Sequence, residues 1–134
     1  IVSEEQLDDG ACDFPRINDN LIGLTSEYGY CMQLKTDVED LTFGEHLFKY
    51  HLESGKRTDH HLGKNVAGGE PVFAPKPGSS KEDEGWILSL VHERETRQSK
   101  LVIIDAEASD QEPVAEVIIP QRVPYGAHGS WIKN

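Results

Sequence analysis

The sequence has few of the features that mark a membrane-spanning, secreted or cysteine-rich protein. No apolar run approaches the roughly 20 residues that a helix needs to cross a bilayer. Cysteine occurs only as Cys12 and Cys31, which is too few for a disulfide framework and lacks CxxC spacing, so reduced thiols are expected. The first residues carry neither the basic nor the apolar region of a signal peptide, and we therefore expect a cytoplasmic location.

Basic residues are also scarce, with 13 Lys and Arg against 24 Asp and Glu in 134 residues and a net charge of -11. This charge repels phosphate and excludes nucleic acid as an expected partner. The acidic residues, including the cluster 82–84, indicate a solvated surface. Because the chain begins with Ile1 instead of Met, we expect a fragment. A lost signal peptide, peripheral membrane contact through missing segments and the oligomeric state stay open.

Short β-like runs separated by turn signals predict an all-β fold. In the run 47–52, Phe48 and Tyr50 alternate with Lys49 and His51, as expected when one face of a strand is buried. A turn at 53–56 then predicts a hairpin with the next run. The expected strands are residues 28–33, 47–52, 57–62, 71–75, 86–92, 100–106 and 114–119.

Two of these runs are almost continuously apolar. Residues 86–91 and 101–104 should therefore be central strands covered on both faces. The polar, proline-bearing segment 76–84 predicts a long surface loop within a hairpin, and residues 1–11 predict a linker or truncated lead-in. The spacing of strands and turns suits the four-stranded blades of a propeller, and a β-sandwich would give much the same spacing.

The segment 123–131 places His128 next to Gly129 in a loop that Pro124 enters and aromatic residues flank. Glycine lets the backbone approach a bound group closely, and a neutral imidazole supplies a lone pair. His128 is therefore a candidate metal ligand. The alternative is a loop histidine that bonds to a backbone carbonyl.

Four further motifs precede this segment in a fixed order, at residues 13–18, 69–78, 82–89 and 101–106. Together with 123–131 they resemble the C-terminal part of the carotenoid cleavage oxygenase family, whose relatives include lignostilbene dioxygenases and the retinoid isomerase of the visual cycle. The resemblance covers residues 12–132. It implies that residues 12–134 form the C-terminal blades of a seven-bladed β-propeller, with antiparallel sheets and long loops.

The resemblance also implies a reaction and a cofactor. The family holds one Fe(II) on the propeller axis through four histidines and uses dioxygen to cleave a double bond in an apolar conjugated substrate, such as a carotenoid, apocarotenoid or stilbene. The products are two carbonyl compounds. Imidazole ligands suit iron and leave coordination positions free for dioxygen.

Several residues match family positions. His128 matches the last of the four iron ligands, and Glu70 and Asp13 match acids that hold the second nitrogen of such imidazoles. The family typically carries glutamate where Asp13 stands, and the shorter side chain puts its hydrogen bond in doubt. The alternatives without a metal are that Glu70 is an ordinary surface glutamate at the start of a strand and that Asp13 is an acid in an N-terminal loop. Tyr125 and Trp131 either line the substrate passage or are buried aromatic residues.

The remaining charged candidates have structural interpretations. Arg16 is expected to pair with a carboxylate or to cap carbonyl groups. His60 and His61 should point to opposite faces of one strand. We expect His46, His51 and His92 to face solvent, in polar-alternating positions.

Two other classes of protein compete with the dioxygenase fragment. One is a stand-alone β-sheet binding module without metal, in which His128 and the acids are structural. The other is a cupin-like iron protein, which would need a His-x-His pair with a following glutamate, whereas His60 and His61 are adjacent. If the fragment interpretation holds, three of four iron ligands lie elsewhere, and the 134 residues alone should neither hold iron tightly nor turn over substrate. The substrate and its cleavage position cannot be read from this sequence.

Overall fold

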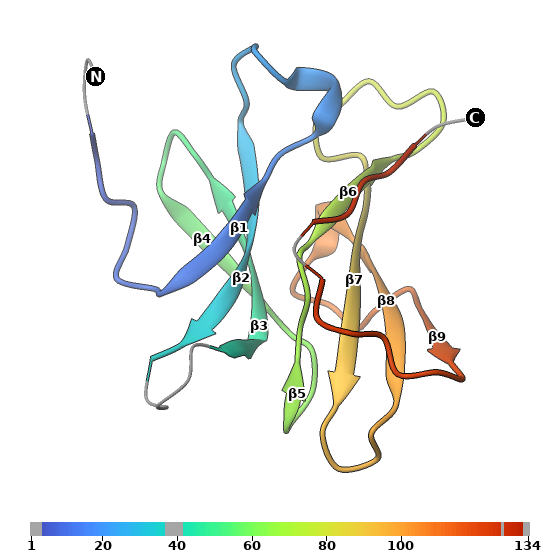
Figure 1. Ribbon diagram of the computed structural model, residues 1–134. Coiled ribbons are helices and arrows are strands. Elements are labelled where there is room, and N and C mark those ends of the chain that lie inside the picture. Colours follow the sequence, from blue (N-terminus) through green and yellow to red (C-terminus); the bar gives the residue numbers. More distant parts are fainter. Residues whose placement is uncertain (1–3, 37–41, 127, 133–134) are drawn as a thin grey trace.

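Two antiparallel β-sheets lie side by side in the computed structural model, which describes residues 4–36, 42–126 and 128–132 (Figure 1). The all-β prediction is confirmed. Helical structure in these residues is limited to two short 3-10 turns, η1 (Asp19–Leu21) and η2 (Ala106–Ala108). Among the same residues, no helix is long and apolar enough to span a membrane.

The first sheet, called sheet A below, has four strands in chain order: β1 (Cys12–Arg16), β2 (Tyr28–Lys35), β3 (Thr42–His51) and β4 (Lys56–His61). The predicted hairpin between β3 and β4 is confirmed, and Gly55 supplies the positive φ of 67° that its turn requires. The sequence did not predict β1, which pairs with β2 at the edge of the sheet.

The second sheet, called sheet B below, contains β5 (Val66–Ala67), β6 (Val72–Pro75), β7 (Gly85–Glu93), β8 (Ser99–Asp105) and β9 (Ala115–Ile119). Strands β5 and β6 both pair with β7, and β8 and β9 follow in order. The short segment between β5 and β6 is therefore an interruption within one edge of the sheet. This interruption positions the site described below.

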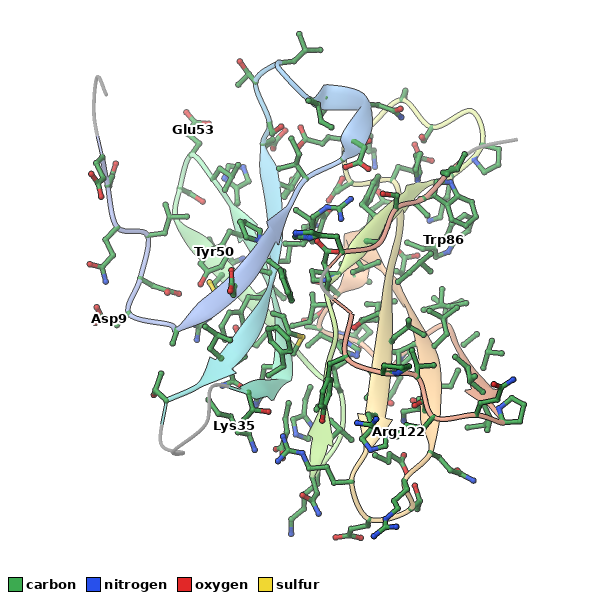
Figure 2. The ribbon with its side chains drawn as sticks, in the orientation of Figure 1. Asp9, Lys35, Tyr50, Glu53, Trp86 and Arg122 are labelled. Carbon is green, nitrogen blue, oxygen red and sulfur yellow. The ribbon has the colours of Figure 1, made fainter. Side chains whose placement is uncertain are left out.

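The core forms where the inner faces of the two sheets meet, and Figure 2 shows the side chains that both sheets carry. Met32 and Leu47 come from sheet A, and Ile87 comes from sheet B; all three are fully buried. Tyr30 stacks on Phe73 with ring centroids 5.7 Å apart and thereby joins the two sheets. Burial of these apolar side chains is the main stabilising contribution to the fold.

The outer face of sheet B differs from the expectation that its central strands are covered on both faces. Residues 86–91 and 101–104 do form the central strands β7 and β8, but burial alternates along them instead of being continuous. Ile87 and Val91 are buried, whereas Leu90 is 43% exposed. In the described residues this second face is covered only in part, by the segment that follows β9, so the prediction of two covered faces is wrong.

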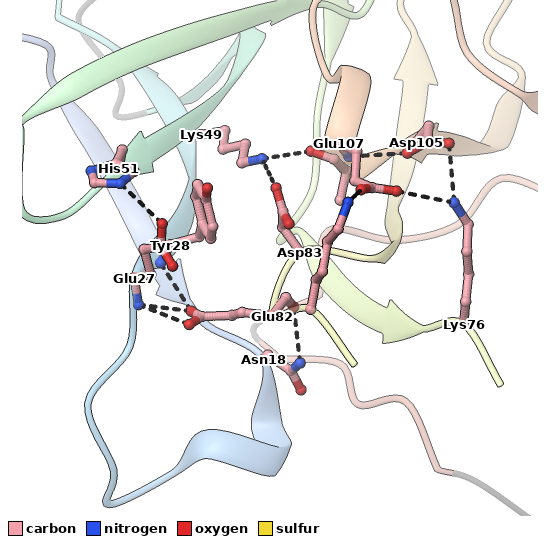
Figure 3. A network of polar contacts seen from close by, with 12 residues as sticks. Asn18, Glu27, Tyr28, Lys49, His51, Lys76, Glu82, Asp83, Asp105 and Glu107 are labelled. Atoms are coloured by element: carbon pink, nitrogen blue, oxygen red, sulfur yellow. Dashed lines mark hydrogen bonds and ion pairs between the residues drawn. The ribbon is translucent and has the colours of Figure 1, made fainter. Parts of the chain in front are cut away.

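The loop between β6 and β7 also differs from its prediction. It belongs to a hairpin, as predicted, but its acidic residues are not simply solvated. The Glu82 carboxylate accepts hydrogen bonds from the backbone amides of Glu27 and Tyr28, and Asp83 lies 2.7 Å from the Lys49 Nζ (Figure 3). The loop therefore attaches sheet B to sheet A.

The histidines outside the terminal segment follow the predictions only in part. His60 is buried and His61 is exposed, which confirms that they point to opposite faces. His46, His51 and His92 are each partly buried, so the expectation that they face solvent is wrong as stated. His60 bonds through Nδ1 to the backbone oxygen of Ser109 at 2.9 Å.

Candidate functional site

Glu70 lies in the interruption between β5 and β6, and the register explains why. Ala67 pairs with His92 and Val72 pairs with Leu88, so five steps along this edge face four steps along β7. The extra residue forms a bulge, and Pro71 favours it because proline has no N–H to donate to β7.

Ser89 and Gly69 fix the shape of this bulge. The Ser89 hydroxyl donates to the Gly69 carbonyl at 2.9 Å and accepts from the Gly69 amide at 3.3 Å. A Cβ on Gly69 would lie 2.7 Å from the backbone oxygen of Leu90, so only glycine fits here. Ser89 was missed by the sequence reasoning, although it is the single polar residue in the apolar run 86–91.

A second bulge lies in β1, opposite the first. Asp13 pairs with Met32 and Arg16 with Tyr30, so three steps along β1 face two along β2. Phe14 adopts a φ of 54° within it, which is unusual for a non-glycine residue. Bulges redirect side chains, and this one brings the Phe14 ring to 5.5 Å from the His128 ring in an edge-on contact.

His128, Glu70 and Arg16 meet at one point between the sheets. The Glu70 Oε1 lies 3.1 Å from the His128 Nδ1 and 3.0 Å from the Arg16 Nη1. The other carboxylate oxygen, Oε2, accepts a hydrogen bond from the Gly129 amide. The Glu70 side chain is only 6% exposed, whereas that of His128 is 75% exposed.

The charge of Glu70 follows from these contacts. Burial acts to raise the pKa of its carboxyl, but the Gly129 amide, the His128 imidazole and the Arg16 guanidinium outweigh burial, and the pKa is lowered. Burial acts to lower the pKa of Arg16, but Glu70 and Asp19 outweigh it and raise that pKa. The site therefore contains a carboxylate that stays ionised and a permanent cation beside it.

The hydrogen bond to Glu70 defines what His128 can do. A carboxylate accepts, so the Nδ1 of the imidazole is the donor and the neutral ring keeps its lone pair on Nε2. An imidazole held in this way has the arrangement of a metal ligand oriented by a carboxylate. The residues present thus fit one ligand position. In the described part of the chain, no three His, Cys, Asp or Glu side chains gather as a metal site.

The structure places the other candidate residues differently. The Asp13 side chain turns back and accepts from the amide of Phe14 at 2.7 Å, and its contacts in the described residues do not reach His128. Tyr125 is 57% exposed and Trp131 is 49% exposed, so the alternative that they are buried is wrong. Arg16 pairs with a carboxylate, as predicted from the sequence, and the structure identifies that carboxylate as Glu70.

A pocket of about 260 Å³ adjoins this site. Its lining includes Glu70, His128 and Tyr125, and its apolar walls come mainly from sheet B, chiefly β7, and from the segment that follows β9. Trp131 is not among the lining residues. A small number of polar groups beside apolar walls is typical of a site for an apolar ligand.

The fold and this site together define an all-β chain with two blade-like sheets and one imidazole held by a buried acid. Residues 2–133 match the family described as retinal pigment epithelial membrane protein. The chain is 30% identical over 133 residues to apocarotenoid-15,15'-oxygenase of Synechocystis and 35% identical over 141 residues to carotenoid 9,10(9',10')-cleavage dioxygenase 1 of Pisum sativum. The chain belongs to the carotenoid cleavage oxygenase family.

Solved structures agree with this membership. The crystal structure of cobalt-substituted Synechocystis apocarotenoid oxygenase superposes with a TM-score of 0.86 at 30% identity, covering 96% of this chain and 26% of that chain. A chimera of this oxygenase with RPE65 gives a TM-score of 0.84 at 26% identity, with the same two coverages. The two sheets are therefore blades of a propeller of this type. The match with the Synechocystis relative spans 99% of this chain and 27% of that protein. The match with the pea relative spans 97% of this chain and 26% of that protein.

Proposed function

We propose that this chain is part of a non-haem Fe(II) dioxygenase that uses dioxygen to cleave a conjugated double bond of a carotenoid or apocarotenoid into two carbonyl products. His128 is one iron ligand and binds through Nε2. The observation that carries this proposal is the hydrogen bond between the His128 Nδ1 and the buried Glu70 carboxylate. The names of the relatives, which are carotenoid and apocarotenoid oxygenases, support the choice of substrate class.

The residues of this chain have separate roles in the proposal. Glu70 fixes the ring of His128 and increases its basicity as a ligand. Phe14 packs against one edge of the same ring and limits its rotation. The apolar pocket beside the site receives part of the conjugated substrate, and Tyr125 contributes to its lining. Iron, when bound, supplies the activation of dioxygen.

The remaining ligands come from residues outside this chain. Asp13 is proposed to orient one of those imidazoles, because it borders the β1 bulge that places Phe14 beside His128. Trp131 is proposed to line the substrate passage beyond the pocket. It follows that the 134 residues alone bind iron weakly and do not turn over substrate.

The test uses the complete protein that contains this chain, reconstituted anaerobically with Fe(II) and assayed with an apocarotenoid, a carotenoid and a hydroxystilbene. We expect stoichiometric iron, aldehyde products that carry oxygen from labelled dioxygen, and loss of both iron and activity in His128→Ala. His61→Ala is the matched control, because His61 is an exposed histidine on β4. Full iron and activity in His128→Ala would refute the ligand assignment. A wild-type protein that binds iron but cleaves only the stilbene would refute the substrate class.

A further inference from the structure

The segment that carries His128 makes few hydrogen bonds to the rest of the described molecule. Residues 128–132 lie outside the strands, and they follow a stretch that runs from β9 back across β8 and β7 (Figure 1). In the described residues 124–126 and 128–132, hydrogen bonds to the rest of the chain are made by His128 and Gly129, and each ends on Glu70 or Arg16. The hydrogen bonds that hold this segment therefore end on two side chains, and Phe14 adds a packing contact with the His128 ring.

Arg16 contacts both the acid and the segment. Its Nη1 donates to the Gly129 carbonyl at 2.7 Å and lies 3.0 Å from the Glu70 Oε1. The Gly129 amide donates to the Glu70 Oε2 and closes a ring of three interactions. Both polar groups of the Gly129 backbone are thus used, so the residue after His128 is fixed on both sides.

The guanidinium is itself held in place. Its Nη2 lies 3.2 Å from the Asp19 Oδ2, which orients the plane of the group from the side away from Glu70. The Arg16 side chain is 16% exposed, and it extends from β1 of sheet A to residues of the segment around sheet B. The planar guanidinium has several N–H donors and can reach Glu70, Gly129 and Asp19 at the same time. A lysine would offer only one nitrogen atom for all three partners.

We propose that Arg16 is the positioning residue of the iron ligand. It touches neither the metal nor the substrate, and it acts through Glu70 and Gly129 to fix the ring of His128 while tying that ring to sheet A. The inference rests on the proposed function where it concerns iron, but the anchoring of residues 128–132 stands on the contacts alone. Removal of Arg16 leaves Glu70 as the single hydrogen-bond partner of residues 128–132 among the described residues.

The experiment compares wild type, Arg16→Gln and Arg16→Lys in the complete protein by hydrogen–deuterium exchange of the metal-free form. We expect the peptide that contains residues 128–132, whose Gly129 amide donates to Glu70, to exchange about tenfold faster in Arg16→Gln, which is the factor that loss of one charge-assisted hydrogen bond gives, while peptides of β7 and β8 stay unchanged. Arg16→Lys keeps the charge without the fork, so we expect an intermediate rate. Arg57→Gln is the matched control, because Arg57 also pairs with two carboxylates but with Asp8 and Asp59.

The second readout is the rate at which a chelator removes iron from the reconstituted protein. Loss of a group that orients a metal ligand typically weakens binding about 10- to 100-fold, and we expect Arg16→Gln to release iron faster within that range. Unchanged exchange and unchanged release in Arg16→Gln overturn the proposal while leaving His128 as a ligand. If wild type binds no iron, the proposed function fails and the exchange comparison still decides the role of Arg16. If Arg16→Gln does not fold, Arg16→Lys decides it: exchange and iron release equal to wild type overturn the proposal.

Discussion

Lys49 offers a quantitative test of how the two sheets are joined. It extends from β3 of sheet A, and its Nζ lies 2.7 Å from the Asp83 Oδ2 and 2.7 Å from the backbone oxygen of Ala106 (Figure 3). The same Nζ lies 4.2 Å from the centre of the Tyr28 ring, which adds a cation–π contact. The side chains of Lys49 and Asp83 are only 11% and 14% exposed, so water competes little for these contacts.

The substitution Lys49→Met removes the cation and leaves the Asp83 carboxylate and a backbone carbonyl without their partner. Breaking a buried ion pair on one side costs about 3–5 kcal/mol, and because this pair keeps some solvent contact we expect about 3 kcal/mol. Neutralising the acid as well, in the double variant Lys49→Met with Asp83→Asn, should recover part of the lost unfolding free energy. We expect a coupling free energy between the two substitutions of about 1–3 kcal/mol.

The assay is urea unfolding followed by tryptophan fluorescence, to which Trp86 contributes from β7 beside Lys76 of this network. The matched control is Lys81→Met. Lys81 also pairs with an acid of the network, Glu107, at 2.9 Å, but its side chain is 69% exposed, so we expect no measurable change. Equal effects of the two lysine substitutions would refute the argument that burial gives the Lys49 contacts their strength.

Three further outcomes follow from the site and the thiols. The lowered pKa of Glu70 means that its contacts stabilise the fold above its ordinary value of 4.5 and are lost as pH falls through the lowered pKa, so Glu70→Gln should flatten the acid limb of a stability-against-pH curve. Burial, and then the neighbouring Cys12, raise the pKa of Cys31, so iodoacetamide should alkylate the exposed Cys12 in the folded protein and Cys31 only in denaturant, as mass spectrometry would show. Gly69→Ala should cost about 1–3 kcal/mol in unfolding free energy because its Cβ would meet a backbone oxygen, whereas Gly126→Ala, with open space around the added atom, is the control. Equal alkylation of the two thiols in the folded protein, an unchanged acid limb or equal effects of the two glycine substitutions would contradict the respective argument.

The strands could be predicted because each runs through several residues of regular pattern. The alternation of Phe48 and Tyr50 with polar neighbours identified β3, and the turn at Gly55 identified its partner. The strand β1 was missed because Pro15 and a bulge interrupt its short pattern, and pairing with β2 stabilises it. The strand β5 has two residues, which is too short for any pattern.

The site could be predicted from the sequence only through the resemblance to a family. No local pattern relates Glu70 to His128, which are 58 residues apart and meet because a bulge in one sheet edge aims the acid at the terminal segment. The pairing of Arg16 with a carboxylate was expected from its chemistry, but the identity of that carboxylate was not. The contact of Phe14 with the imidazole was missed because a positive φ at a phenylalanine leaves no signal in the sequence.

The roles of Glu82 and Asp83 could not be read from their composition. A run of three acids at 82–84 usually faces solvent, and the sequence offered nothing to suggest otherwise. In the structure the loop folds against sheet A, where the backbone amides of Glu27 and Tyr28 donate to Glu82 and the Lys49 ammonium donates to Asp83. Such pairing depends on the relative placement of two sheets, which a sequence pattern does not contain.

The central claim is that the Nε2 of His128 is an iron ligand whose Nδ1 is held by Glu70. Anomalous diffraction at the iron edge, from crystals of the complete reconstituted protein, tests it most directly. The account predicts an anomalous peak at bonding distance from the Nε2, with the hydrogen bond between Nδ1 and Glu70 preserved. A peak bonded to Nδ1, or an iron position remote from His128, would contradict it.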